Sequence, residues 1–366
     1  MTPTPDRALI VHVVSHTHWN REWYLPAGRF RQRLVLLIDE LLDDSADVAP
    51  FLLDGQAIVL EDYLAVRPEL RDALAARLRD GSLEAGPWYV LADELIPSGE
   101  SLVRNLLAGR EVLRTLGAVP PPVLYSPDAF GHPAMLPASA AGFGRPLIVL
   151  WRGYGGASHP AGDGARWRAP DGSAALLYHL SPDGYELGSS LPASESAAHT
   201  RWSSLHRVLA PRATVGEVLL PNGADHHARQ PERARAVRAL ASAAAPSEVR
   251  LTSLGDFARA IVARAARAML PEVAGELRDS YGYAWALQGT FATRSALKRR
   301  AARAERSLLR HTEPWVALAD RARAKDRGAL LRAAWKTLLQ CQPHDTVCGC
   351  SVDAVARAMA SRLEDV

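Results

Sequence analysis

The sequence predicts an α/β fold with a mostly parallel sheet, followed by a helical bundle. Short apolar runs alternate with amphipathic helical stretches from residue 8 to about residue 255, the pattern of strand–helix–strand units. Right-handed crossovers between such units build either a barrel or a doubly wound sheet. After about residue 290, apolar residues recur at helical spacing only. Strands and then helices along the chain therefore predict two parts of different architecture.

The first two strand–helix units are the clearest. ALIVHVV (8–14) and FLL (51–53) are continuous apolar runs that predict buried strands. Pro68 falls where a second helix restarts, a first-turn position that tolerates proline. The apolar positions of the two helical faces are Phe30, Leu34, Leu37, Ile38 and Leu41, and then Val59, Tyr63, Val66, Leu70, Leu74 and Leu78.

Further short apolar runs predict the remaining strands. The segment 167–180 predicts a hairpin around an Asp171-Gly172 turn, because Asp-Gly favours the tight turns of hairpins. The other predicted strands are WYVL (88–91), VLYS (123–126), PLIVLW (146–151) and GEVLLP (216–221).

Composition and charge exclude several classes of protein. The 366 residues are 48% hydrophobic and 23% charged, which is globular usage. The net charge is +3, without a long basic block, so there is no electrostatic footprint for nucleic acid. No apolar stretch approaches the ~18 residues of a membrane span, and the N-terminus lacks a targeting pattern. Three cysteines, all within 341–350, form no disulfide framework, so we expect a cytoplasmic protein.

Polar residues recur directly after the predicted strands. In parallel α/β folds the carboxyl ends of the strands converge on the active site, so these groups meet although they are distant in sequence. One such residue is an ordinary helix cap or loop acid, but six strands ending in this way favour a site. The residues are His16, His18, Asn20, Asp54, Asp93, Glu94, Asp128, Arg152 and Asp225.

The segment VHVVSHTHWNREWY (11–24) is the first dense cluster. If the strand continues, His16, His18 and Asn20 share one face because strand side chains alternate. Two imidazoles and an amide oxygen form a half-site for a divalent metal. For His12 we favour a buried histidine with satisfied hydrogen bonds.

Three further clusters carry candidate residues. Asp128 in YSPDAFGHPAMLP (125–137) is a metal ligand, a nucleophile or a helix N-cap, and these residues alone leave all three open. Asp225 lies in LLPNGADHH (219–227), and His344 and Asp345 in QPHDTVCGCS (342–351). We interpret Cys348 and Cys350 as buried thiols rather than metal ligands, because zinc sites more often use CxxC spacing.

Taken together, these segments resemble the α-mannosidases of glycoside hydrolase family 38, in the bacterial branch that includes mannosylglycerate hydrolases. The likeness runs in order from about residue 9 to residue 351. The segments that carry it are HTHWNREWY, LDGQ (53–56), GPWYVLADE (86–94), SGES (98–101), PDAFGHPAMLP, LWRG (150–153), NGADHH, GELR (275–278) and QPHDTVCG.

The resemblance implies a fold and a set of roles. It implies a seven-stranded α/β barrel-like domain over residues 1–270 and a helical middle domain, a three-helix bundle, over residues 271–366. One Zn²⁺ would be bound by His18, Asn20, Asp128 and His344. Asp128 matches the family nucleophile and Asp225 the general acid/base. The matched sugar-contacting residues are Trp23, Phe130, Arg152 and Asp345.

The implied activity is a retaining, metal-dependent hydrolysis of terminal α-D-mannosides or mannosyl conjugates. Such hydrolysis uses two carboxyls ~5–5.5 Å apart, one that attacks the anomeric carbon and one that protonates the leaving oxygen. Asp128 would form the glycosyl-enzyme, and a nearby cation and Arg152 would lower its pKa. The metal would hold vicinal sugar hydroxyls rather than activate water.

Two departures from the family pattern leave alternatives open. Asn20 stands where the family has a metal-binding aspartate, and the chain ends at Val366 without the β-rich domains that follow in the family. A sugar-binding pseudoenzyme is therefore one alternative, and a homo-oligomer or a partner chain that supplies the β-domains is expected. The pair His16–His18 also allows an amidohydrolase-type metal hydrolase. Many such enzymes need a bridging lysine, and this chain has no lysine before Lys298.

Overall fold

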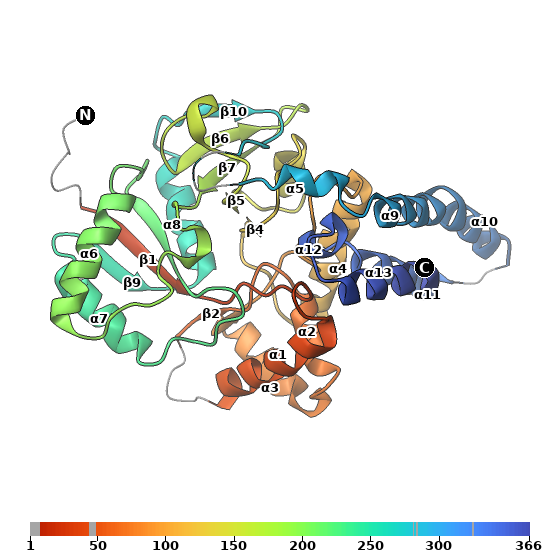
Figure 1. Cartoon of the computed structure of the whole chain (residues 1–366), viewed down its shortest axis with the longest axis horizontal. Helices are drawn as coiled ribbons and strands as arrows, with labels where there is room; N and C mark the ends of the chain where they lie inside the picture. The colour runs from red at the N-terminus through yellow and green to blue at the C-terminus, as the bar shows by residue number, and fades with distance from the viewer. Residues whose placement is uncertain (1–7, 44–48, 281, 283–284, 324–325) are drawn as a thin grey trace.

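The computed structural model describes residues 8–43, 49–280, 282, 285–323 and 326–366. Residues 1–7, which belong to the segment searched for a targeting pattern, lie outside this range. The strands are β1 (Ile10–Ser15), β2 (Phe51–Leu52), β3 (Leu83–Glu84), β4 (Val123–Ser126), β5 (Leu147–Leu150), β6 (Gly164–Arg168), β7 (Ala174–His179), β8 (Glu217–Asn222), β9 (Glu248–Leu251) and β10 (Glu272–Ala274) (Figure 1).

Helices alternate with these strands and then continue alone. They are α1 (Ala27–Asp43), α2 (Ile58–Leu64), α3 (Arg71–Arg79), α4 (Gly99–Thr115), α5 (Leu136–Gly142), α6 (Glu195–Leu209), α7 (Arg233–Ala243), α8 (Leu254–Ala265), α9 (Ser295–Ser307), α10 (Glu313–Arg323), α11 (Gly328–Leu339), α12 (His344–Cys348) and α13 (Asp353–Asp365). Among the described residues, no helix is long and apolar enough to span a bilayer.

Strand β1 lies at the centre of a three-stranded parallel sheet with the order β8-β1-β9. Val11 is paired with Val218 on one side and with Val249 on the other. Helices α6 and α7 lie beside this sheet (Figure 1), and Leu205 and Leu240 join Val11 in one buried cluster. A strand buried on both faces explains the continuous apolar run of the sequence.

A second sheet has the order β10-β6-β7-β5-β4, and β2 and β3 form a third, two-stranded sheet. Strands β6 and β7 are antiparallel, as the predicted hairpin requires. At its turn Gly172 has φ of 88°, and the Ser173 N–H donates to Asp171 Oδ1 at 2.9 Å. An isolated bridge between His16 and Leu52 connects the first and third sheets. The α/β prediction is confirmed, whereas closure into a seven-stranded barrel stays a prediction.

Two local predictions are wrong. WYVL (88–91) is not a strand, because the backbone N–H groups of Tyr89 and Val90 bind the side chain of Asn105 rather than a neighbouring strand. Val66 is half exposed, since α2 ends at Leu64 and the chain turns before Pro68 begins a 3₁₀ turn. The buried face of α1, by contrast, consists of the five predicted apolar residues.

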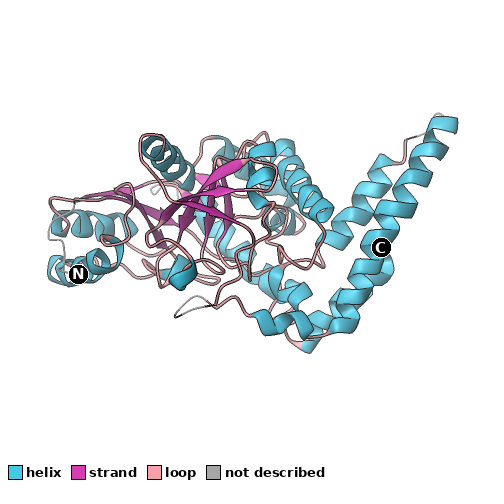
Figure 2. Cartoon of the chain, turned by 90° about the horizontal axis from the view of Figure 1, so that it is seen from above, coloured by secondary structure: helices cyan, strands magenta, loops and turns pink. Residues whose placement is uncertain are grey.

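After residue 286 the described residues contain helices and turns but no strand, and Pro343 forms an isolated bridge with Ala92. Ala301, Trp335, Leu338 and Met359 form the centre of a separate buried cluster between α9, α11 and α13. These helices project to one side of the sheets (Figure 2). Three backbone hydrogen bonds return the chain to the α/β part: Asp93 N–H to the Gln342 carbonyl, His344 N–H to the Leu91 carbonyl and Val352 N–H to the Trp23 carbonyl, each 3.0 Å. They bring α12 to the polar loops that follow the strands.

Candidate metal and active site

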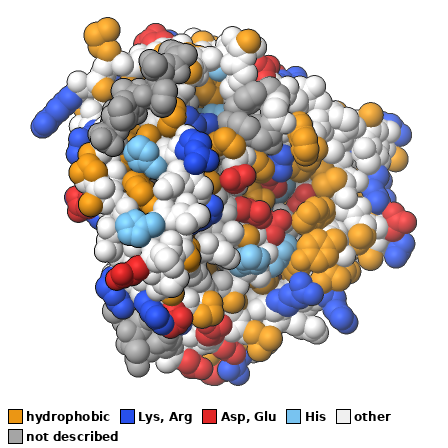
Figure 3. All heavy atoms as spheres, turned by 60° about the vertical axis from the view of Figure 1, so that its left-hand side comes forward, with side chains coloured by type: hydrophobic (Ala, Val, Ile, Leu, Met, Phe, Trp, Pro, Cys, Tyr) orange, Lys and Arg blue, Asp and Glu red, His pale blue; other side chains and the backbone are white. Residues whose placement is uncertain are grey.

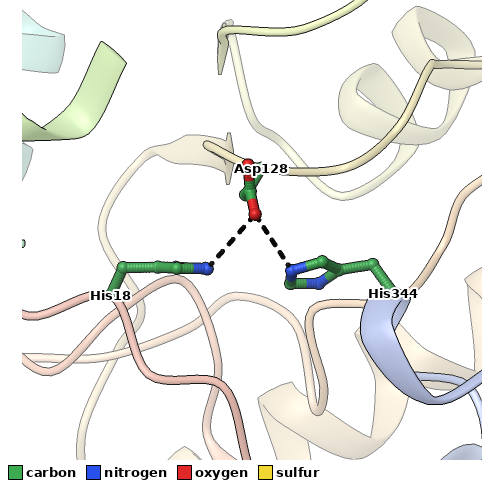
Figure 4. A group of neighbouring side chains, drawn as sticks. All are labelled: His18, Asp128 and His344. Atoms are coloured by element: carbon green, nitrogen blue, oxygen red, sulfur yellow. Dashed lines mark ion pairs between the residues drawn. The ribbon is translucent and has the colours of Figure 1, made fainter. Parts of the chain in front are cut away.

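Three buried side chains from distant segments form one compact group. His18 follows β1, Asp128 follows β4, and His344 begins α12, and one potential ligand atom of each lies within 4.8 Å of the others. Both histidines approach the same carboxylate oxygen: His18 Nε2 lies 3.9 Å and His344 Nε2 3.4 Å from Asp128 Oδ2. Figure 4 shows the two rings on either side of the carboxylate. Acidic and histidine side chains also gather on one face in Figure 3.

The donor set of this group fits a divalent cation. Two imidazole nitrogens and one carboxylate oxygen are ligands that zinc uses in proteins. The Nε2 atoms of His18 and His344 are buried and have no hydrogen-bond partner among the described residues. Their Nδ1 atoms lie near acceptors: His344 Nδ1 is 3.0 Å from the Leu91 carbonyl, and His18 Nδ1 is 3.2 Å from Asp54 Oδ2, an ion-pair contact that lacks hydrogen-bond geometry. Acceptors at Nδ1 favour the tautomer that leaves Nε2 free to bind a metal.

Asp54 is a residue of this site that the sequence indicated only as an acid after a strand, without a role. It is fully buried, adopts φ of 88°, and accepts the N–H groups of Trp19 and Gly55 at 2.8 Å each. Burial opposes its charge, but His18 and these N–H donors hold the pKa of Asp54 below its ordinary value. Its place at the end of β2 was the only sequence signal, because the orientation of a side chain in the left-handed backbone region is not visible in a sequence pattern.

The electrostatics of the group favour positive charge between the carboxylates. Burial alone would lower the pKa of both histidines. Asp54 nevertheless raises the pKa of His18 to about 9, and Asp345 and Asp128 raise the pKa of His344 to about 10. Burial would likewise raise the pKa of Asp128, but Arg152 and His344 hold it well below its ordinary value. The site is thus built to keep Asp128 ionised and to attract a cation.

The remaining predicted metal ligand, Asn20, is also buried. Its Oδ1 atom has no hydrogen-bond partner among the described residues, while its backbone carbonyl accepts from His226 Nε2 at 3.1 Å. An unpaired buried acceptor two residues after His18 fits a ligand role. Asn20 Oδ1 therefore makes no hydrogen bond to the three grouped residues.

Arg152, at the end of β5, is paired with the nucleophile candidate. Its Nε donates to Asp128 Oδ1 at 2.6 Å, so the two oxygens of Asp128 face different partners. The guanidinium lies 4.4 Å from the Trp151 ring centroid and 5.7 Å from that of Phe130. The Phe130 ring meets the His344 ring edge to face at 5.4 Å. Arg152 and Phe130 therefore lie beside Asp128 and His344, and their contact with the sugar stays a prediction.

Asp225 lies beside His18 through the backbone. The two residues form an isolated bridge, and the His226 N–H donates to the His18 carbonyl at 2.9 Å. The Asp225 side chain accepts from the Tyr185 hydroxyl at 3.1 Å, and the Tyr185 ring lies 4.7 Å from the His18 ring. Asp225 is near the metal group without being a member of it.

Asp345 and Trp23 differ in how closely they approach the group. Asp345 Oδ2 lies 3.5 Å from His344 Nε2, and burial raises the pKa of Asp345. The half-buried Trp23 ring packs on Tyr24 at 5.2 Å, and its described contacts do not include the metal group.

Cys350 is exposed and donates its thiol to Asp345 Oδ1 at 3.1 Å, so the prediction of two buried thiols is wrong for Cys350.

The other two histidines of the first segment have structural contacts. His12 Nε2 lies 2.7 Å from Glu217 and its Nδ1 3.2 Å from the Thr252 hydroxyl, which confirms the buried, hydrogen-bonded interpretation. His16 Nε2 lies 2.7 Å from the Tyr185 carbonyl, and His16 is not a member of the metal group.

Comparison with known proteins places the chain in a family. The domain described as "Glycosyl hydrolases family 38 N-terminal domain" matches residues 8–276, and the "Alpha mannosidase middle domain" matches residues 286–366. A relative from Halalkalibacterium halodurans, provisionally named a mannosylglycerate hydrolase, is 33% identical over 371 residues, covering 97% of this chain and 41% of the relative.

Two solved structures agree with this match. An alpha-mannosidase from Enterococcus faecalis V583 superposes with a TM-score of 0.91 at 32% identity, over 98% of this chain and 41% of that chain. A second family 38 protein from Enterococcus faecalis superposes with a TM-score of 0.80 at 28% identity, over 98% of this chain and 38% of that chain. The chain spans about two fifths of the length of these relatives. It belongs to glycosyl hydrolase family 38.

Proposed function

We propose that this chain carries the catalytic part of a retaining, metal-dependent α-mannosidase that acts on terminal α-D-mannosides. One observation supports this above all. Asp128 is a buried carboxylate with one oxygen bound by Arg152 and the other facing two imidazoles whose Nε2 atoms are free. This is the environment of an ionised nucleophile beside a cation site. We further propose that the three sheets correspond to the seven-stranded barrel-like domain of the family.

His18, Asn20, Asp128 and His344 would hold one Zn²⁺, or another divalent cation. When bound, the cation supplies a Lewis acid that grips two vicinal hydroxyls of the sugar. The chain prepares this site by turning the Nδ1 atoms of both histidines toward Asp54 and the Leu91 carbonyl. Their fixed orientation removes the need to reorder the rings when the cation binds.

Asp128 would attack the anomeric carbon of the mannoside. The C1–O bond to the aglycone breaks as the bond between C1 and Asp128 forms, and Asp225 gives its proton to the leaving oxygen. In the second step Asp225 takes a proton from water, which attacks C1 and releases mannose and free Asp128. Arg152 keeps Asp128 charged before the attack and positions it for the anomeric carbon.

Four further residues would contact the sugar. Phe130 and Arg152 lie against Asp128 and His344, and Asp345 presents a buried carboxyl next to His344. Carboxyl and guanidinium groups recognise sugar hydroxyls by hydrogen bonds, and aromatic rings pack on sugar faces. Trp23 would form an outer wall of the site. The substrate would be an α-mannoside or mannosyl conjugate, met in the cytoplasm.

A sugar-binding pseudoenzyme is the second candidate, and Asn20 is the observation that favours it. An amide in place of a carboxylate removes one negative charge from the cation site and lowers its affinity. The amidohydrolase alternative gains no support, because His16 is not a member of the group of described residues that could hold a metal.

Release of nitrophenol from 4-nitrophenyl α-D-mannoside, with added zinc, tests the proposal. The wild type should turn over, and Asp128→Asn should not, although its amide oxygen still offers a ligand. Asp72→Asn, a change of an exposed aspartate on α3, is the matched control and should behave as the wild type.

Calorimetry with methyl α-D-mannoside separates the hydrolase from the sugar-binding pseudoenzyme. Binding without turnover at any zinc concentration would establish the pseudoenzyme and contradict the hydrolase.

A further inference from the structure

Two buried histidines hold the backbone of consecutive residues at the end of β5. The Trp151 carbonyl lies 2.9 Å from His179 Nε2, and the Arg152 carbonyl 3.2 Å from His132 Nε2. Both histidines are almost fully buried, and neither has a role in the mechanism above. The backbone at Arg152 is therefore held by hydrogen bonds from two buried side chains, in addition to the hydrogen bonds of strand β5.

His132 is itself oriented by a buried carboxylate. Its Nδ1 lies 2.7 Å from Glu94 Oε2, and the two side chains are 0% and 2% exposed. The His132 backbone is fixed as well, because it exchanges two hydrogen bonds with Leu277, at 2.9 and 3.0 Å. Each ring nitrogen therefore faces an acceptor, one on Glu94 and one on Arg152. A rotated or displaced ring would lose both contacts inside a buried region, where unpaired polar groups are costly.

The loop 128–132 consequently holds Arg152 at both ends. Asp128 binds the side chain through Nε at 2.6 Å, and His132 binds the backbone carbonyl. Gly131 makes this double contact feasible: its φ is 130°, and a Cβ there would lie 2.8 Å from a Leu95 methyl and 3.1 Å from the Leu277 carbonyl. Glu94, from the loop after residues 88–91, supports the same arrangement from a third segment.

We propose that Glu94 and His132 are positioning residues that hold Arg152 against the nucleophile Asp128. The inference rests on the proposed function for its kinetic consequence and on the described contacts for its structural one. An arginine side chain has many rotamers. The fixed backbone carbonyl sets where the side chain begins, and hydrogen bonds to Asp128 and to the Trp285 carbonyl hold the guanidinium, so a shift of the backbone would move it relative to Asp128. Misplacement of a catalytic group by about 1 Å costs on the order of 10²-fold in rate. Neither Glu94 nor His132 would touch the sugar.

A double-mutant cycle tests whether His132 acts through Arg152. We expect His132→Ala to lower kcat by about 10- to 100-fold in the wild-type background. In the Arg152→Ala background the same change should cost less than about twofold, because the group it positions is gone. Equal losses in the two backgrounds, or no loss in the first, would overturn the proposal. A merely structural role would give independent, additive losses.

Conservative variants refine the test and guard against misfolding. The amide of His132→Gln can still donate to the Arg152 carbonyl, so this variant should retain more activity than His132→Ala. Glu94→Gln keeps an acceptor for His132 Nδ1 and should be milder than Glu94→Ala. His199→Ala, at an exposed histidine on α6, is the matched control and should leave kcat unchanged. If His132→Ala does not fold, the cycle is run with His132→Leu, which fills the space of the ring but offers no donor to the Arg152 carbonyl, and the same criterion applies.

A crystal structure of the folded His132 variant gives a readout that is independent of activity. We expect Arg152 Nε to move out of hydrogen-bond distance of Asp128 Oδ1, from 2.6 Å in the native chain. An unchanged contact would overturn the positioning role, whatever the kinetics. If the wild type with zinc hydrolyses no α-mannoside, the proposed function fails, and this structural result alone decides on Glu94 and His132.

Discussion

His18 and His344 approach the same oxygen of Asp128, at 3.9 and 3.4 Å, although they belong to the two ends of the chain. The ring of His18 extends from the α/β part, and that of His344 from the helical part (Figure 4). A cation bound between them would therefore join the two parts. The charges of the side chains around the site would set how tightly such a cation binds.

Asn20→Asp should tighten zinc binding by at least tenfold, about 1.4 kcal/mol. The change restores a carboxylate where a buried amide oxygen now lacks a partner among the described residues. A second negative charge close to the cation adds a Coulomb attraction that water screens little at a buried site. Zinc titration by calorimetry measures the difference, with activity expected to rise in parallel. A wild type that already binds zinc as tightly as the variant would show that Asn20 does not weaken the site.

Asp225→Asn should slow hydrolysis most for substrates with poor leaving groups. General acid catalysis typically contributes 10²- to 10⁴-fold, and an aryl leaving group needs little protonation. We therefore expect a large loss of kcat/KM on alkyl α-mannosides and a small loss on 4-nitrophenyl α-D-mannoside. Tyr185→Phe removes the hydroxyl that donates to Asp225 and should cause a milder loss with the same trend. Equal losses on both kinds of substrate would remove Asp225 from the acid role.

Arg362→Ala should lower the free energy of unfolding by about 3 kcal/mol. Arg362, on α13, pairs with Glu22, a fully buried carboxylate that also accepts from the Thr346 hydroxyl at 3.0 Å. Loss of one partner leaves a buried charge without compensation, which costs several kcal/mol. Urea unfolding measures the change.

Arg357→Ala is the control for this prediction. Arg357 is exposed on the same helix, and such substitutions usually change stability by less than about 0.5 kcal/mol. Because Glu22 follows Asn20 in one segment and Thr346 follows His344, Arg362→Ala should also weaken zinc binding. Similar effects of the two arginine changes would contradict the account of Glu22.

His179 makes stability depend on pH. Burial and the nearby Arg212 lower the pKa of His179 to about 3, so the folded chain keeps this ring neutral. Between pH 6.5 and about 3 the unfolded chain binds a proton here that the folded chain does not. Stability therefore falls as pH falls, by up to about 1.4 kcal/mol per pH unit.

His179→Gln removes this titration and keeps a donor for the Trp151 carbonyl. The wild type should lose more unfolding free energy than the variant between pH 7 and pH 5, as measured by urea unfolding at both values. Comparison of the two chains cancels the contributions of the other histidines. Parallel curves would show that His179 does not titrate in this way.

The fold was predictable where apolar residues follow one period without interruption. Strand β1 and helix α1 have such patterns, and both lie where the sequence predicted them. WYVL (88–91) failed because the side chain of Asn105, distant in sequence, provides the hydrogen bonds that a neighbouring strand would have provided. Strand β9 was not predicted, since its EVRL segment lacks a continuous apolar run.

The sequence indicated which residues form the candidate site, but it did not indicate how their side chains contact one another. Strand ends and the family resemblance indicated His18, Asp128 and His344, and the structure brings these three together. Their supporting contacts depend on side-chain orientation between segments that have no common sequence pattern. Asp54 beside His18 and Glu94 beside His132 are such contacts, and both residues were visible in the sequence only as acids after a strand or a predicted strand.

Trapping of the glycosyl-enzyme tests the central claim, that Asp128 is the nucleophile of a retaining mannosidase. The zinc-loaded chain is incubated with 5-fluoro-α-D-mannosyl fluoride, whose fluorine slows the second step, and then digested for peptide mass spectrometry. We predict a fluoromannosyl mass on Asp128 within the peptide that contains PDAFGHP, and none on the Asp128→Asn variant. Turnover with a label on a different carboxylate, or with no covalent label at all, would contradict the claim.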